Sequence, residues 1–200
     1  MRLIALLAAA LMLAACAPPR QPMGEFPARL GAMELGHVVV VADKPTKSPV
    51  SRDASAEEWT AALQKAFTDR FGRNEGTKYY HFGLHVDGYA LAPPGIPLVA
   101  TPRSVLIVSA TLWDDELGGK VNETPRQFTV FESLSGETAL GSGLFKTKEQ
   151  QLEALAFNAA LEVERWLLEN PQWFPEPGSD DAIEAEPLPA VVLPPPRPAG

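Results

Sequence analysis

The sequence contains a single cysteine, Cys16, among its 200 residues. Because there is no second cysteine, no disulfide bond can form within the chain, and a folded domain must be held together by its hydrophobic core. Cys16 follows an apolar segment, Leu3–Leu13, which begins after the basic residue Arg2 and is separated from Cys16 by two alanines. This segment is too short to cross a hydrocarbon core of about 30 Å. It is typical of a cleavable signal peptide.

The residues Leu13-Ala14-Ala15-Cys16 resemble the lipobox of bacterial lipoproteins. The resemblance implies a signal peptide over residues 1–15, cleavage before Cys16, and attachment of diacylglycerol to the Cys16 thiol. Two or more acyl chains anchor a protein stably, since each buried methylene contributes about 0.8 kcal/mol. Ala17 stands where, in lipoprotein families, an aspartate favours retention at the inner membrane, so the resemblance implies the outer membrane, facing the periplasm. The alternatives are a plain secretory signal, and Cys16 as a buried or unpaired thiol.

Composition divides the remaining chain into three segments. Residues 16–33 are rich in proline and predict an extended tether, and residues 34–174 carry the periodic patterns of one domain. Residues 175–200 combine prolines with acidic residues and predict a disordered tail. Without residues 1–15, which include Arg2, 16 basic residues remain against 25 acidic ones, a formal net charge of −9. This balance argues against nucleic acid binding through a basic patch.

Two helices are predicted in the domain segment from capping signals and apolar spacing. Ser55 and Glu58 have the spacing of a capping box, and apolar residues on one helical face follow them as far as Gly72. Thr147 and Gln150 form a second capping box, which begins a longer apolar periodicity that ends at Asn170-Pro171. We therefore expect one helix early in the domain and one at its end.

Strands are predicted around and between the helices. A β-branched run over residues 36–42 predicts a buried strand, and residues 78–91 alternate with a period of two. Further strands are predicted over residues 104–113 and 126–134, with a turn at 135–137 and a short return strand at 138–140. The element order β-α-β-β-β-α predicts an α+β fold, a two-layer sandwich whose four- or five-stranded sheet has both helices on one face.

This element order, together with the lipobox and the proline-rich tether, resembles small envelope lipoproteins. Similar proteins include the lipopolysaccharide-assembly lipoprotein, the ABC-transport auxiliary lipoproteins and uncharacterised alphaproteobacterial lipoproteins. In the domain the resemblance covers residues 34–174 as element order alone. It therefore implies a location in the cell envelope and no particular binding residues.

Candidate catalytic and metal-binding residues are few. His81 and His85 lie four residues apart on one strand, about 13 Å from each other, whereas two ligands of one zinc ion lie within about 3–4 Å. His85 and Asp87 share a strand face and could form a hydrogen bond, but the sequence marks no serine as their partner in a catalytic set. We therefore expect no metal site, no cofactor and no enzymatic activity.

A possible binding surface follows from the predicted layers. Because two helices cover one face of a sheet, the other face is left open, and aromatic side chains gathered there predict a partner-binding surface. The residues expected on the open face are Tyr79, His81, His85 and Tyr89, with Val105, Ile107 and Trp113 beside them. The alternative is that the proline-rich connection over residues 93–102, or the tether over residues 17–33, covers this face.

These observations favour a lipid-anchored, periplasmic binding or scaffold protein of the bacterial envelope. Such a protein could serve as an accessory to an assembly or transport machine. Its partners would be the membrane, through the lipid on Cys16, and an envelope protein. The alternative is a carrier that holds a lipid or another apolar ligand between the helices and the sheet. An unrecognised enzyme is the third reading.

Overall fold

The computed structural model of the protein describes residues 29–93, 104–132 and 146–175. Several predictions fall outside these residues: Cys16 with the signal peptide, most of the tether and of the proline-rich connection, the turn and strand at 135–140, and the tail from residue 176 onwards. In the three described ranges, no helix combines the length and the apolar character that crossing a membrane requires.

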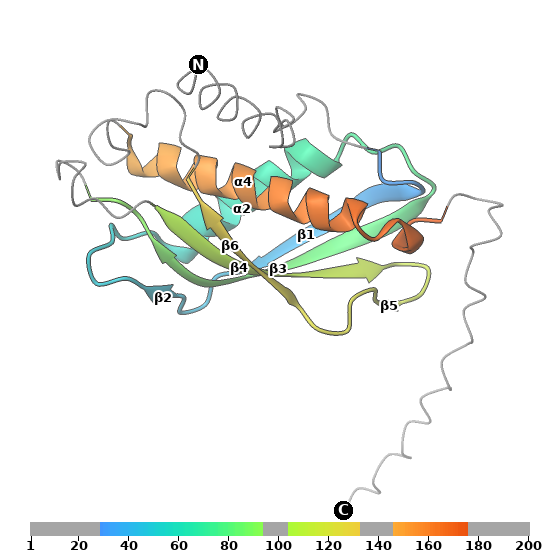
Figure 1. Ribbon diagram of the computed structural model, residues 1–200, viewed down its shortest axis with the longest axis horizontal. Coiled ribbons are helices and arrows are strands. Elements are labelled where there is room, and N and C mark those ends of the chain that lie inside the picture. Colours follow the sequence, from blue (N-terminus) through green and yellow to red (C-terminus); the bar gives the residue numbers. More distant parts are fainter. Residues whose placement is uncertain (1–28, 94–103, 133–145, 176–200) are drawn as a thin grey trace, which may run out of the picture.

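The described residues form one mixed sheet of six strands, and two long helices lie together on one of its faces (Figure 1). The strands are β1 (Met33–Val41), β2 (Thr46–Lys47), β3 (Lys78–Ala90), β4 (Val105–Asp114), β5 (Gly119–Lys120) and β6 (Arg126–Phe131). The helices are α2 (Ala56–Phe71) and α4 (Lys148–Leu168), followed by a 3-10 helix, Pro171–Trp173. The predicted two-layer α+β sandwich is confirmed, and the two-residue strands β2 and β5 add to its four long strands.

Strand β3 is the centre of the sheet. It pairs in parallel with β1 and β2 and antiparallel with β4. On the far side of β4, β5 and β6 both pair antiparallel with that strand. This order places β1 at one edge of the sheet and gives β3 and β4 the longest shared ladder.

Both helices begin at the predicted capping boxes. Ser55 Oγ accepts a hydrogen bond from the Glu58 N–H at 3.2 Å, and the Glu58 carboxylate accepts one from the Ser55 N–H at 2.8 Å. Thr147 and Gln150 form the same reciprocal pair at the start of α4. These bonds satisfy backbone donors that have no partner inside the first helical turn.

The two helices run in the same direction, and an ion pair joins them at each end. Lys148 at the start of α4 contacts Glu58 at the start of α2, and Arg70 near the end of α2 contacts Glu164 near the end of α4. The Arg70–Glu164 contact is bidentate and largely buried. It therefore fixes the relative position of the helices more firmly than an exposed pair would.

Aromatic side chains fill the space between the helices and the sheet. The Phe82 ring of β3 lies 5.2 Å from the Phe67 ring and 4.7 Å from the Phe71 ring of α2, measured between centroids. Trp59 contacts Tyr89 at a centroid distance of 5.3 Å. All five side chains are buried and belong to one continuous cluster, and a fully buried ring of this kind contributes on the order of 1.5–3 kcal/mol.

The prediction that Tyr89 lies on the open face is wrong. A β-bulge at Asp87 shifts the register of β3 against β4, between the pairs Val86–Val108 and Gly88–Ile107. The extra residue turns the following side chains over, as a bulge does, so Tyr89 faces the core and is only 6% exposed. Its hydroxyl accepts a hydrogen bond from the Ala54 N–H and donates one to the Ala54 carbonyl, each at 3.1 Å.

The prediction of a buried strand over residues 36–42 is wrong for alternate residues. Because β1 is an edge strand of a sheet with one open face, Val38 and Val40 pack against the core while Val39 and Val41 are exposed. The core also begins earlier than residue 34, since Leu30 and Met33 are buried. A β-branched run therefore predicts the strand correctly, but it does not predict whether both faces of the strand are buried.

The double hydrogen bond of Tyr89 leads to a prediction about stability. Tyr89→Phe should lower the free energy of unfolding by about 1–3 kcal/mol, because it leaves the N–H and carbonyl of Ala54 without their buried partner. Urea denaturation measures this change. The matched control is Tyr79→Phe, whose hydroxyl is on the exposed face, and it should change stability by less than about 0.5 kcal/mol. Equal effects of the two variants would contradict the buried position of Tyr89.

Candidate functional site

The face of the sheet opposite the helices is the candidate functional site, and we call it the open face (Figure 1). Strand pairing places His81 beside Trp113, and His85 beside Ser109. On this face lie outward residues of the four long strands, among them Val39, Val41, Tyr79, His81, His85, Asp87, Val105, Ile107, Ser109, Thr111, Trp113, Gln127, Thr129 and Phe131. The structure thus brings together the predicted residues Tyr79, His81, His85 and Trp113, and places Tyr89 on the other side of the sheet.

Large apolar side chains on the open face are strongly exposed. Five of them have relative solvent exposures between 39% and 56%: Val39, Val41, Tyr79, Trp113 and Phe131. They come from four different strands, so the exposure extends across the width of the sheet. Single exposed apolar residues are common on protein surfaces, whereas several on one flat face are typical of a surface that binds a partner.

Asp87 is the centre of a polar network on the same face. Its Oδ1 lies 2.7 Å from His85 Nδ1, and its Oδ2 accepts hydrogen bonds from Ser109 Oγ at 2.6 Å and from Gln127 Nε2 at 3.0 Å. The four residues come from β3, β4 and β6, so the carboxylate ties three neighbouring strands together. Ser109 and Gln127 could not be recognised as partners from the sequence, because the bulge that aims Asp87 at them is not visible in the alternation.

The surroundings of Asp87 act on its pKa in opposite directions. Partial burial raises the pKa of this carboxyl, but hydrogen bonds from Ser109, Gln127 and His85 favour the charged form. The hydrogen bonds prevail, and the pKa of Asp87 lies below the ordinary value. The carboxylate is therefore charged at neutral pH and contributes to the stability of the open face.

The arrangement around Asp87 does not match that of a hydrolytic triad. In a triad the histidine lies between the serine and the carboxylate, so that it can take the proton of the serine hydroxyl. Here the carboxylate lies in the middle, because Ser109 and His85 both bond to it through different oxygens. The serine proton points at Asp87, which holds Ser109 as a structural donor.

His81 is held between β1 and the turn that follows β4. Its Nδ1 accepts a hydrogen bond from the His37 N–H at 2.9 Å, and its Nε2 lies 3.2 Å from Asp115 Oδ1. The His81 ring also stacks on the His37 ring, with a centroid distance of 5.1 Å and an interplanar angle of 14°. Within the described part of the chain, no group of three His, Cys, Asp or Glu residues is placed to hold a metal ion.

Trp113 and Tyr79 each have a charged neighbour. Lys120 Nζ lies 5.6 Å from the centre of the Trp113 ring, within the range of a cation–π contact. The Glu34 carboxylate, through its negative charge and a hydrogen bond, raises the pKa of the Tyr79 hydroxyl. At neutral pH Tyr79 therefore presents an uncharged ring with a polar tip, a side chain that is common in binding surfaces.

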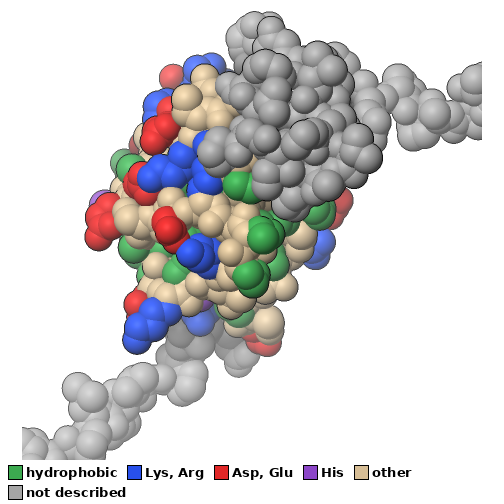
Figure 2. Space-filling view, turned by 90° about the vertical axis from the view of Figure 1, so that its left-hand side faces the viewer, with side chains coloured by type: hydrophobic (Ala, Val, Ile, Leu, Met, Phe, Trp, Pro, Cys, Tyr) green, Lys and Arg blue, Asp and Glu red, His purple; other side chains and the backbone are tan. Residues whose placement is uncertain are grey.

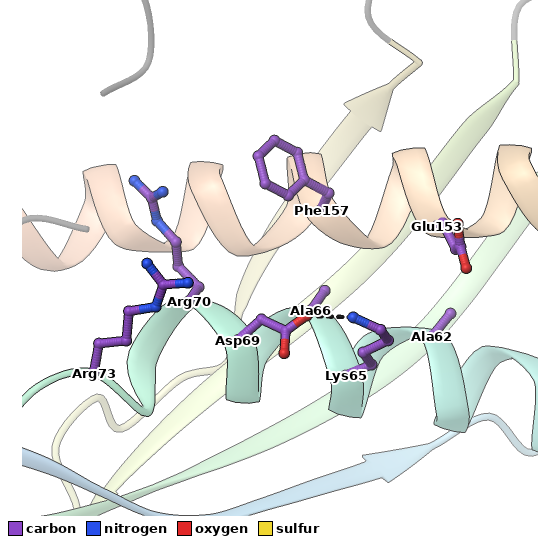
Figure 3. Close-up of a pocket in the computed structure, with 8 residues that line it drawn as sticks. All are labelled: Ala62, Lys65, Ala66, Asp69, Arg70, Arg73, Glu153 and Phe157. Carbon is purple, nitrogen blue, oxygen red and sulfur yellow. Dashed lines mark hydrogen bonds and ion pairs between the residues drawn. The ribbon is translucent and has the colours of Figure 1, made fainter. Parts of the chain in front are cut away.

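A separate pocket of about 290 Å³ lies on the outer side of the helix pair, away from the open face (Figure 3). Its lining includes Phe157 of α4 and three cationic side chains, Lys65 and Arg70 of α2 and Arg73 in the turn after it. Lys65 is paired with Asp69, and Arg70 with Glu164. Because carboxylates already neutralise two of its three cations, this pocket has little net charge to offer an ionic ligand.

Charged side chains of both signs are intermixed at the end of the molecule that Figure 2 shows. On the described surface visible there, acidic and basic side chains lie next to one another, and hydrophobic side chains gather in one area. A mixed surface of this kind gives little long-range attraction for a polyanion.

Comparisons with known proteins identify similar solved structures. No protein-family model matches the sequence, and no curated protein is similar to it. A candidate lipoprotein from Caulobacter crescentus is 15% identical, with a TM-score of 0.39 over 67% of this chain and 89% of that chain. A protein from Xanthomonas campestris assigned to family DUF330 is 16% identical, with a TM-score of 0.40. The match covers 74% of this chain and 94% of that chain. A minor lipoprotein from Acinetobacter baumannii is 18% identical, with a TM-score of 0.28. The match covers 67% of this chain and 93% of that chain.

The lowered pKa of Asp87 leads to a prediction about pH. Asp87→Asn should reduce the free energy of unfolding at neutral pH by about 1–3 kcal/mol, because the amide accepts weaker hydrogen bonds and donates where Asp87 accepts. A carboxyl with a lowered pKa in the folded state stabilises the protein above its ordinary pKa of about 3.9, and this contribution disappears as the pH falls through the folded value. The difference between the two proteins should therefore close in strong acid.

Urea denaturation of both proteins at about pH 7 and about pH 2 measures this difference. The matched control is Asp43→Asn, which changes an exposed carboxylate in the loop after β1 and should have little effect at either pH. An equal loss of stability by Asp87→Asn at both pH values would show that the charge of Asp87 is not the cause.

Proposed function

We propose that this protein is a lipid-anchored, non-enzymatic domain of the bacterial envelope that binds a protein partner through the open face of its sheet. The observation that carries the proposal is the set of exposed apolar side chains across that face, opposite a face that two helices cover. The lipid on Cys16 and a position on the periplasmic side of the outer membrane rest on the sequence around that cysteine.

The packing between the layers favours a partner over an internal ligand. A carrier of lipid would need apolar space between the helices and the sheet. In the described residues that space is occupied by contacting side chains, among them Trp59, Phe67, Phe71 and Phe82, each at most 1% exposed. The apolar area available for binding therefore lies outside the sandwich, on the open face.

The edge strand β1 is a less suitable binding element than the open face. An exposed edge recruits other strands through its free backbone groups, and proteins block such edges with bulges and side-chain contacts. In β1 the register shifts between Leu35 and Val38, and Gln64 Nε2 of α2 donates to the Val38 carbonyl at 3.1 Å. These contacts leave the face, rather than the edge, as the surface for a partner.

The contacts of the polar side chains support a non-enzymatic role. Asp87 uses its oxygens to hold three neighbouring side chains, and His81 uses both ring nitrogens on fixed partners. A general base or nucleophile needs a free atom within reach of a substrate. Asp87 and His81 are instead engaged in holding neighbouring strands together.

The proposed anchor is tested with Cys16→Ser. The wild-type chain should incorporate a palmitate analogue in bacterial cells and fractionate with the outer membrane, whereas the variant should take up no label and become soluble in the periplasm. Ala17→Ser is the matched control and should behave like the wild type. Labelling that persists in Cys16→Ser would contradict lipidation at this residue, and labelled protein in the inner membrane would contradict the proposed location.

The proposed surface is tested by photo-crosslinking in intact cells, with a photoreactive amino acid at position 113 or 41 on the open face. We expect both positions to give the same protein adduct. Val39→Glu should reduce its yield by about tenfold or more, since burying an unpaired carboxylate in an apolar interface costs at least about 1.4 kcal/mol.

The control positions lie on the opposite side of the molecule. Phe157 is exposed on α4, so a crosslinker there should give no such adduct, and Phe157→Glu should leave the adduct at position 113 unchanged. An adduct that forms equally from position 157, or that survives Val39→Glu, would show that the open face is not the binding surface.

A further inference from the structure

The regular backbone pairing between β1 and β3 is interrupted at one place. The register shifts between Leu35 and Val38, so Gly36 and His37 do not follow the regular pairing with β3. At this interruption the His37 N–H donates to the side chain of His81, at 2.9 Å from Nδ1. A histidine ring thus takes the place of a backbone acceptor in holding β1 to the sheet.

The two bonds of the His81 ring define its protonation state. Because Nδ1 accepts from an N–H, it carries no proton, and Nε2 is therefore the nitrogen that bears one. Nε2 is 3.2 Å from Asp115 Oδ1, which can accept that proton in a hydrogen bond. The contact with β1 consequently requires the neutral form of His81, in the Nε2–H tautomer.

The backbone is shaped to receive this ring. A Cβ atom on Gly36 would lie 2.4 Å from Cε1 and from Nδ1 of His81, so any other residue would displace the ring. On its outer side the ring is stacked against His37. The imidazole is therefore held between a glycine and a second imidazole.

We propose that the contact of His81 with the His37 N–H is a pH-sensitive latch, which holds β1 to β3 in neutral solution and opens when His81 takes up a proton. Protonation places a hydrogen on Nδ1 of His81, which can then no longer accept a hydrogen bond. The hydrogen bond from the His37 N–H is therefore lost. Histidine is the side chain whose charge ordinarily changes between about pH 5 and 8. The latch is a property of the fold and operates whether or not the open face binds the proposed partner.

The charges around His81 explain why opening is confined to β1. Asp115, in the turn after β4, faces Nε2 and can hold the ring in its charged form, so the bond to Asp115 persists while the bond to β1 breaks. The neighbouring charged and titratable groups on the packed elements are Glu34 and His37 of β1, Lys78, Tyr79 and His85 of β3, and Glu116 and Lys120 beyond β4. Lys78 is paired with Glu116 at 2.6 Å, and Lys120 lies over the Trp113 ring.

The latch controls part of the open face. Val39 and Val41 follow the interruption directly on β1, and both contribute exposed apolar area to that face. Release of the His37 N–H removes the contact that holds β1 to β3 where their pairing is interrupted. Acidification should therefore loosen this edge of the surface while the β3–β4 ladder, at the centre of the sheet, stays intact.

Hydrogen–deuterium exchange of the full chain in detergent micelles tests the latch, with rates corrected for the intrinsic pH dependence of exchange. Between about pH 7.5 and about pH 5.5, amide protection of residues 37–41 should fall by about tenfold, the equivalent of one lost hydrogen bond. Protection of residues 106–112 in β4 should stay constant. Equal protection of residues 37–41 at both pH values would overturn the proposal.

Three variants identify the responsible group. His81→Gln supplies an amide that does not titrate and should abolish the pH response, whereas the matched change His85→Gln should preserve it. His37→Ala removes the stacked ring and keeps the N–H, so it should also preserve the response. A response that survives in His81→Gln, or that disappears in His37→Ala, would show that the N–H bond to His81 is not the latch.

Discussion

The packing of Phe82 against Phe67 and Phe71 is the contact on which the rest of the structure depends. The chain has no disulfide to restrain it, so the position of the helices on the sheet is fixed by apolar contact. Phe82 belongs to β3, the strand that pairs with β1, β2 and β4. When the aromatic cluster fixes β3 against α2, it fixes the centre of the sheet, and the remaining strands are placed by their pairing with β3 and β4.

The two faces of the sheet are stabilised by different interactions. On the covered face, apolar side chains remove one another from water and fill the space beneath α2 and α4. On the open face, side chains form hydrogen bonds between neighbouring strands. Asp87 joins β3 to side chains of β4 and β6, and His81 joins β3 to the backbone of β1. Because these hydrogen bonds hold the strands together on the open face, the exposed apolar side chains there are not needed for stability.

The elements themselves could be predicted from the sequence, because their signals are local. A capping box is made by residues three apart, and the alternation of a strand is visible within a few residues. The fold class follows from their order, because amphipathic helices need an apolar sheet face to cover. The helix starts at Ser55 and Thr147 and the four long strands are therefore found where the patterns place them.

The details of the candidate site could not be predicted, because they depend on one inserted residue and on contacts distant in sequence. Extending the alternation of β3 through Asp87 assigns Tyr89 to the wrong face, since a bulge leaves no mark in the pattern. The partners of Asp87, Ser109 and Gln127, lie 22 and 40 residues away along the chain. The same bulge thus buries Tyr89 and aims Asp87 at its partners, so a single backbone irregularity determines both sides of the sheet.

The chain length before the domain limits where the open face can act. If Cys16 carries the proposed lipid, residues 17–28 span at most about 43 Å even when fully extended. The chain then enters the core at Leu30 and begins β1 at Met33, so the domain cannot leave the layer next to the membrane. Confinement raises the effective concentration of the open face for any partner in the same layer, and a modest apolar surface is then sufficient for binding. In the proposed function the anchor would therefore supply proximity, and the open face would supply contact.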